Sequence, residues 1–159
     1  MLCSKVVKNA RDILIHELNR DYNIGRLMEL KLYECIQSSL AHTRILHESQ
    51  LRQLYGWDSS GIDFLIEYEH GIVPIQCKYR KTRRREDYGI RNFLKSIVFI
   101  QEHHPKPILF GLWVSRMTPF EDNRAILCDN NIHSVSNFSS MEVLADCVIK
   151  TITQLLQKQ

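Results

Sequence analysis

The stretch GIDFLIEYEHGIVPIQCKYRK, residues 61–81, decides the fold that this sequence predicts. It contains two runs rich in β-branched and aromatic residues, 62–68 and 72–79, on either side of His70 and Gly71. A glycine at such a junction can adopt the positive φ that a tight turn requires. The stretch therefore predicts an antiparallel hairpin with a two-residue loop.

Side chains alternate between the two faces of a strand, so the hairpin sorts its residues into two sets. A two-residue loop pairs Asp63 with Lys78 and Leu65 with Gln76, and directly paired residues share a face. A shift by one residue would mix polar and apolar groups on both faces, so the pattern fixes the parity of the pairing. The apolar face, expected on the core, holds Ile62, Phe64, Ile66, Tyr68, Val73, Ile75, Cys77 and Tyr79.

The opposite face brings together Asp63, Gln76 and Lys78. A carboxylate and an amide oxygen are hard ligands that suit Mg²⁺ or Mn²⁺, and the backbone carbonyl of Cys77 can supply a third oxygen. A cation there would lower the pKa of a bound water and neutralise a phosphodiester, and Lys78 would orient the attacking water or stabilise the developing negative charge. The alternative is a surface Asp–Lys pair worth at most about 1 kcal/mol, a common arrangement.

A second acid of interest is Glu29, on a helix predicted for residues 26–41. Apolar residues follow it at i+4, i+7 and i+11, so Glu29 lies within the apolar stripe of that helix. A charge in that position is costly without a partner. Two interpretations remain open: an acid that serves a metal site at the sheet, or a glutamate at the rim that caps near Gly25 or pairs with a lysine.

Positive charge is concentrated directly after the hairpin. Residues 78–91 hold seven cations against Glu86 and Asp87, a net +5, whereas the whole chain carries +3. Arginine presents a fork that suits phosphate oxygens, which favours a contact with DNA. A solvated loop, a localisation signal or a site for an acidic partner are the alternatives. The residues expected to bind DNA are Arg80, Lys81, Arg83, Arg84, Arg85, Arg91 and Lys95.

The whole sequence reads as a single domain, residues 1–159, with a core of about 25–136 between an N-terminal helix, 1–20, and a C-terminal helix, 140–157. Residues 48–60 are expected to form a polar connection. Such an order of elements implies an α/β sandwich around a mixed sheet. The expected elements are helices 4–20 and 26–41, strands 43–47, 62–68 and 72–79, helix 86–104, strand 108–114, helix 121–129, strand 132–135 and helix 140–156.

Several classes of protein are disfavoured by composition. The five cysteines are odd in number and scattered, which favours reduced thiols in an intracellular setting over disulfides or a zinc site. No apolar run approaches the length of a membrane span, and no phosphate-binding or dinucleotide fingerprint indicates a nucleotide cofactor. The seven histidines lack ligand spacing, so they are expected to be structural or on the surface.

With these residues identified, the sequence resembles the PD-(D/E)XK nuclease superfamily. It looks closest to the branch with a Gln-x-Lys third motif, found in Mrr-type restriction endonucleases, and to the archaeal Holliday-junction resolvases. The matching pieces are Gly61-Ile62-Asp63 and, after twelve intervening residues, Gln76-Cys77-Lys78, together with the helix segment 25–29 that ends in Glu29. The resemblance covers roughly residues 25–136 and implies a restriction-endonuclease-like α-β-β-β-α-β core.

The resemblance also implies an activity: metal-dependent hydrolysis of DNA, in which Asp63 and Gln76 help to bind Mg²⁺ or Mn²⁺, Lys78 assists catalysis and Glu29 is an auxiliary acid. It implies a homodimer, because cutting two strands requires two sites. Ile62 stands where the family name has proline, and Gln76 replaces the commoner acid, which leaves the site one negative charge short. A catalytically degenerate member that only binds nucleic acid is the alternative.

Overall fold

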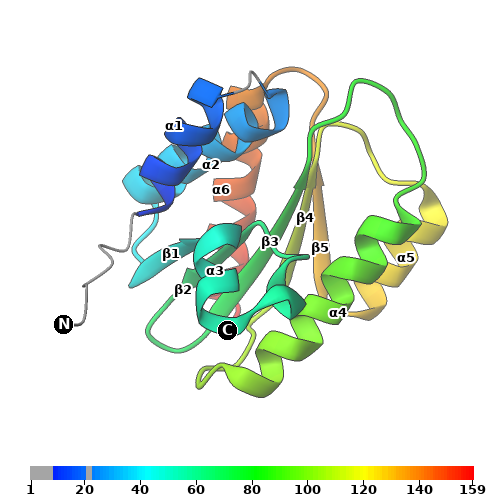
Figure 1. Ribbon diagram of the computed structural model, residues 1–159. Coiled ribbons are helices and arrows are strands. Elements are labelled where there is room, and N and C mark those ends of the chain that lie inside the picture. The colour runs from blue at the N-terminus through cyan, green and yellow to red at the C-terminus, as the bar shows by residue number, and fades with distance from the viewer. Residues whose placement is uncertain (1–8, 21–22) are drawn as a thin grey trace.

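The computed structural model describes residues 9–20 and 23–159 and has a five-stranded mixed sheet at its centre (Figure 1). The strands lie in sequence order, with β1–β2 and β2–β3 antiparallel and β3–β4 and β4–β5 parallel. This architecture confirms the α/β class and the mixed sheet predicted from the sequence. The strands are β1 (Arg44–His47), β2 (Phe64–Glu67), β3 (Ile72–Lys78), β4 (Gly111–Ser115) and β5 (Ile132–Ser136).

Helices cover both faces of the sheet (Figure 1). On one face lie α1 (Ala10–Arg20), α2 (Ile24–Ser39) and α6 (Met141–Gln157), and on the other lie α4 (Asp87–His103) and α5 (Glu121–Asp129). These bounds agree with the predicted helices to within a few residues at the ends that the structure describes; residues 4–8 of the first predicted helix lie outside the described part. None of the helices described is both long enough and apolar enough to cross a membrane.

The face of the hairpin that the alternation predicts to be apolar packs into a core, and the opposite face packs into a second core that the sequence did not predict. Phe64 and Ile75 belong to the core beneath α1, α2 and α6, whereas Leu65 and Ile72 belong to the core beneath α4. Ile62 is the exception: it was assigned to the first core and lies in the second. The reason is that β2 begins only at residue 64, after a bend, so strand alternation does not extend back to position 62.

The loop of the hairpin differs from the prediction. Glu67 pairs with Ile72, so four residues rather than two connect the strands, and the register is displaced by two residues with its parity preserved. The two-residue loop would have opposed Pro74 to Glu67 at a hydrogen-bonded pair, where proline has no N–H to give. In the structure Pro74 faces Leu65 instead, at a pair that exchanges no hydrogen bonds, so nothing is lost to β2.

The polar connection expected at residues 48–60 is wrong. The segment forms a helix, α3 (Glu48–Tyr55), and a 3₁₀ turn, η1 (Trp57–Ser59). A capping box begins α3: the His47 side chain accepts from the N–H of Ser49 (3.4 Å), and the Gln50 side chain accepts from the N–H of His47 (2.8 Å). Leu51 anchors the helix in the second core. Histidine is an uncommon N-cap residue, so no ordinary helix start signal precedes this helix in the sequence.

Candidate active site

Asp63 occupies the bend immediately before β2 and is buried. Its N–H donates to the carbonyl oxygen of Ile75 (2.9 Å), and its carboxylate Oδ2 accepts from the N–H of Cys77 (2.8 Å). These two bonds fix the carboxylate against the second half of β3, where Gln76 and Lys78 lie on either side of Cys77. The residues that the sequence singled out therefore meet at one end of β3, although through a different register.

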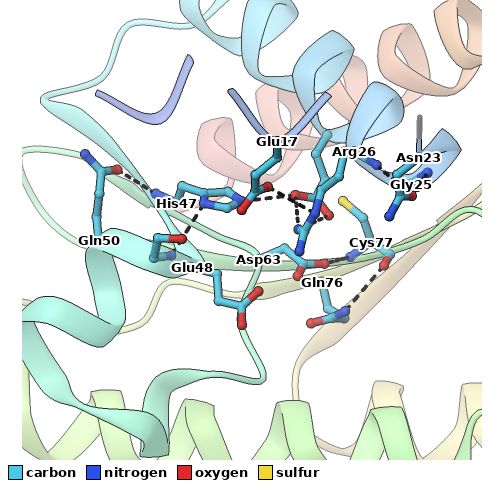
Figure 2. A network of polar contacts seen from close by, with 12 residues as sticks. Glu17, Asn23, Gly25, Arg26, His47, Glu48, Gln50, Asp63, Gln76 and Cys77 are labelled. Atoms are coloured by element: carbon cyan, nitrogen blue, oxygen red, sulfur yellow. Dashed lines mark hydrogen bonds and ion pairs between the residues drawn. The ribbon is translucent and has the colours of Figure 1, made fainter. Parts of the chain in front are cut away.

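Gln76 brings an amide to the same place. Its side chain is 7% exposed, and its Nε2 donates a long hydrogen bond to the carbonyl oxygen of Cys77 (3.3 Å). The Cys77 side chain packs against the first core, as expected, and burial raises the pKa of its thiol. The backbone of Cys77, rather than its sulfur, contributes to the site. The carboxylate of Asp63, the amide of Gln76 and the carbonyl of Cys77 are thus neighbours (Figure 2).

Lys78 ends β3 with its side chain lying against the first turn of α4. A methyl group built on Gly89 would come within 3.3 Å of Lys78 Cε and within 3.3 Å of Trp113 Cη2. The helix can approach the lysine this closely because residue 89 carries no side chain. Gly89 was not identified from the sequence, where a glycine in the first turn of a predicted helix was the available signal.

Glu29 is buried, and two side chains contact its carboxylate. Arg26 Nη1 donates to both of its carboxylate oxygens (3.0 Å each), and His47 Nε2 lies 3.1 Å from Oε2 (Figure 2). Arg26 also forms an ion pair with Glu17, Nε to Oε2 at 3.1 Å. The structure shows a buried, paired glutamate, with an arginine and a histidine as partners in place of a lysine, and the side chain of Asn23 caps the helix. The role of Glu29 as an auxiliary acid stays a prediction. His47 is structural, as expected.

The electrostatics of Asp63 are unfavourable for a carboxylate without a cation. Burial raises its pKa well above the usual value, and repulsion from Glu29 and then from Glu48 adds to the effect. The hydrogen bond from Cys77 and the charge of Lys78 oppose the rise without cancelling it. A divalent cation would offset this repulsion, so the oxygen donors fit Mg²⁺ or Mn²⁺. Within the described ranges, no group of three His, Cys, Asp or Glu side chains forms a ready metal cluster.

The arginines after β3 are mostly tied to acids. Arg80 pairs with Glu86, Nη2 to Oε2 at 3.2 Å, and Arg84 Nε lies 3.7 Å from the same carboxylate. Arg85 donates to Asp87 (Nε to Oδ2, 2.9 Å) and also pairs with Asp122 of α5. These contacts neutralise part of the charge that the sequence concentrates there. The segment is therefore a loop held in place by ion pairs, rather than an unpaired cationic tail.

Arg83 holds the same loop in place through contacts that involve no acidic side chain. Its guanidinium donates to the carbonyl oxygens of Thr118 (2.8 Å) and Pro119 (3.1 Å), and it lies over the ring of Phe120 at 4.2 Å. Three other cations of the expected DNA-binding set remain available. These are Lys81, Arg91 and Lys95, whose exposed side chains make no ion pair or hydrogen bond with any residue that the structure describes.

Comparisons with known proteins agree with this fold. No protein-family model matches the chain, and no curated protein matches it. Among solved structures, the chain is similar to the small subunit of the heterodimeric restriction endonuclease R.BspD6I, with a TM-score of 0.58 and 16% sequence identity over 92% of this chain and 87% of that one. The protein therefore has a restriction-endonuclease-like fold.

Proposed function

We propose that the protein is a metal-dependent DNA nuclease that hydrolyses phosphodiester bonds at the site around Asp63. One observation carries the proposal: the hydrogen bond from Cys77 to Asp63 gathers a carboxylate, an amide and Lys78 at one end of β3 in a restriction-endonuclease-like fold. A carboxylate and an amide can hold a cation that activates water, and a lysine can stabilise the negative charge that develops on the phosphate. The Gln-x-Lys resemblance supports the same activity.

Each residue has a distinct role in this proposal. Asp63, Gln76 and the carbonyl of Cys77 would hold Mg²⁺ or Mn²⁺, which supplies Lewis acidity to the scissile phosphate and a more acidic bound water. Lys78, whose side chain lies against the turn that contains Gly89, would direct its ammonium group toward the attacking water or the negative charge that develops on the phosphate. Glu29, paired with Arg26 and His47, adds negative potential behind Asp63.

DNA is expected to lie across the cationic surface that begins at the basic loop and continues along α4. The exposed side chains of Lys81, Arg91 and Lys95 would contact phosphates, and the paired arginines Arg80, Arg83, Arg84 and Arg85 would shape the loop and contact phosphates with their remaining N–H groups. A duplex needs two cuts, so the active form is expected to contain a second active subunit. The structurally similar restriction subunit belongs to a heterodimer, and here a second copy of the chain is the simplest partner.

The test is cleavage of a panel of linear, nicked, flapped and four-way DNA by the full chain with Mg²⁺ or Mn²⁺. Lys78→Ala is the matched variant, because Lys78 ends its strand half-buried and its removal leaves Asp63 bonded to Cys77. We expect cleavage by the wild type and a loss of at least about 100-fold in the variant. Equal cleavage by the two proteins would contradict the proposal.

A second candidate is a nucleic-acid-binding module that has kept the fold without the chemistry. The specific observation in its favour is the lack, among the described residues, of a cluster of three metal-binding side chains, with an amide at position 76. This candidate predicts salt-sensitive DNA binding by both wild type and Lys78→Ala, and nicking by neither.

A further inference from the structure

The backbone of Glu48 is hydrogen-bonded to the backbone of Asp63, so the two residues lie side by side. It is the first residue of α3, directly after β1, and its N–H donates to the carbonyl oxygen of Asp63 (3.0 Å). The pairing of β1 with β2 fixes this contact, because His47 pairs with Phe64 at the end of the ladder. Glu48 is therefore held next to the proposed metal ligand by two elements that are adjacent in the sheet.

The Glu48 carboxylate is largely buried and poorly compensated. Its side chain is 18% exposed, and the only ion-pair partner that the described residues give it is Arg52, at 4.0 Å from Nη1 to Oε1. A site that holds two neighbouring carboxylates is stabilised by a cation.

Glu29 is far more fully engaged than Glu48. Both oxygens of Glu29 accept from Arg26, and one of them also lies against His47. In Figure 2 the side chains of Arg26 and His47, the partners of Glu29, lie on the α2 side of the strands, whereas the side chains of Glu48 and Gln76 lie on the opposite side. Glu48, rather than Glu29, thus shares a face with the amide of the proposed site.

Gln76 is the independent observation that points to a ligand. Its side chain is more than nine-tenths buried, and its amide oxygen Oε1 accepts no hydrogen bond from any residue that the structure describes. A cation between this oxygen and the nearby carboxylates would give it a partner.

We propose that Glu48 is the second carboxylate of the divalent-cation site, where it supplies the negative charge that Gln76 does not. The inference rests on the proposed nuclease function and concerns the same site. One carboxylate and one amide give a single formal negative charge, whereas Asp63 and Glu48 together match the charge of Mg²⁺ or Mn²⁺. Affinity for such cations depends on the number of charged oxygen ligands.

The experiment is calorimetric titration of Mn²⁺ into the full chain without DNA. The variants are Glu48→Gln, which keeps size and helix propensity, and Asp63→Asn; the matched control is Glu69→Gln, whose side chain is 87% exposed at the hairpin loop. We expect the Kd for Mn²⁺ to rise by at least about tenfold in Glu48→Gln and in Asp63→Asn, and to stay unchanged in Glu69→Gln.

The outcomes separate this inference from the proposed function. Wild-type affinity in Glu48→Gln, with binding lost in Asp63→Asn, would overturn the role of Glu48 and leave the nuclease site intact. A wild type that binds no Mn²⁺ would overturn both. Were Glu48 merely a stabiliser of the start of α3, Glu48→Gln would lower the Tm without changing the Kd. Glu48→Asp retains the charge on a shorter side chain and is expected to bind Mn²⁺ with intermediate affinity. This variant still tests the role of Glu48 if Glu48→Gln folds poorly.

Discussion

The carboxylate of Asp63 accepts a hydrogen bond from the backbone N–H of Cys77 across the bend that precedes β2. This bond joins the two halves of the candidate site, since it fixes the acid of one strand against the Gln76–Lys78 segment of the next. A backbone donor also leaves the second carboxylate oxygen free for other partners. The geometry of the site thus depends on main-chain structure as much as on side-chain identity.

Asp63→Asn is expected to separate stability from activity. Asparagine can still accept from Cys77 N–H, yet it removes a buried charge that Glu29 and Glu48 repel. Because the pKa of Asp63 is raised in the folded state, ionisation opposes folding at neutral pH, and this cost disappears in the variant. In EDTA at pH 8 we expect the Tm to rise by about 2–4 °C, the shift that 1 kcal/mol produces in a chain of this length.

In the same variant, DNA cleavage with Mg²⁺ should fall by at least about 100-fold, because the cation loses its charged ligand. Differential scanning fluorimetry and a plasmid-nicking assay on one preparation give both readings. A variant that is less stable than the wild type in EDTA would contradict the electrostatic argument, whatever its activity.

Gly89→Ala tests the support of Lys78. The added methyl group would lie 3.3 Å from both Lys78 Cε and Trp113 Cη2, closer than side chains ordinarily approach, so the flexible lysine is expected to move. Alanine improves helix propensity by about 1 kcal/mol, which offsets the crowding. We therefore expect cleavage to fall by about tenfold with little change in Tm. Full activity would show that the position of the lysine does not depend on this contact.

From Phe64 onward the sequence was sufficient to predict which hairpin residues share a face, but not to predict the register of the two strands. Residue type indicates burial, so the sequence predicted the alternation of buried residues around Phe64 and Ile75. It also predicted the burial of Glu29 within an apolar stripe. The displacement by two residues depends on where Pro74 can sit without a lost hydrogen bond. That choice is settled by pairing across the sheet and not by local pattern.

Other parts of the site depend on contacts between distant segments. Helix α3 starts with a His–Gln capping box in place of the usual residues, and without that helix Glu48 could not be placed beside Asp63. The basic run looked uncompensated because its partners are remote: Asp122, which pairs with Arg85, is 37 residues away in the sequence. Only the folded chain shows that much of this positive charge is already neutralised.

Glu67 is expected to give the protein a pH-dependent stability at acid pH. It is buried and accepts from Arg44 (Nη2 to Oε1, 3.1 Å) and His104 (Nε2 to Oε1, 2.9 Å). Burial alone would raise its pKa, but these hydrogen bonds and charges outweigh burial and leave the pKa lowered. Such a group contributes its full stability above its unfolded-state pKa of about 4.3 and loses it as the pH falls through the folded-state value.

Glu67→Gln should therefore lower the free energy of unfolding by about 1–3 kcal/mol at pH 7. The difference from the wild type should shrink once the pH falls below about 4. Urea denaturation at both pH values measures it, with exposed Glu69→Gln as the control that should match the wild type at each pH. A difference that persists undiminished at low pH would point to lost packing instead of lost charge.

The pairing within the basic loop predicts unequal effects of its cations on DNA binding. Lys81 is exposed and makes no ion pair with a described residue, whereas Arg85 is paired with Asp87 and Asp122. Each phosphate contact by a free cation releases a counterion, so Lys81→Ala should weaken binding and reduce the slope of log K against log salt by about 1. Arg85→Ala removes a charge that is already compensated and should change the slope less.

Fluorescence anisotropy with a labelled duplex in EDTA, over a series of NaCl concentrations, measures both slopes without cleavage. Equal slopes for the two variants would mean that DNA displaces the acids from Arg85, and the loop would then act as the uniform cationic track that its sequence suggests.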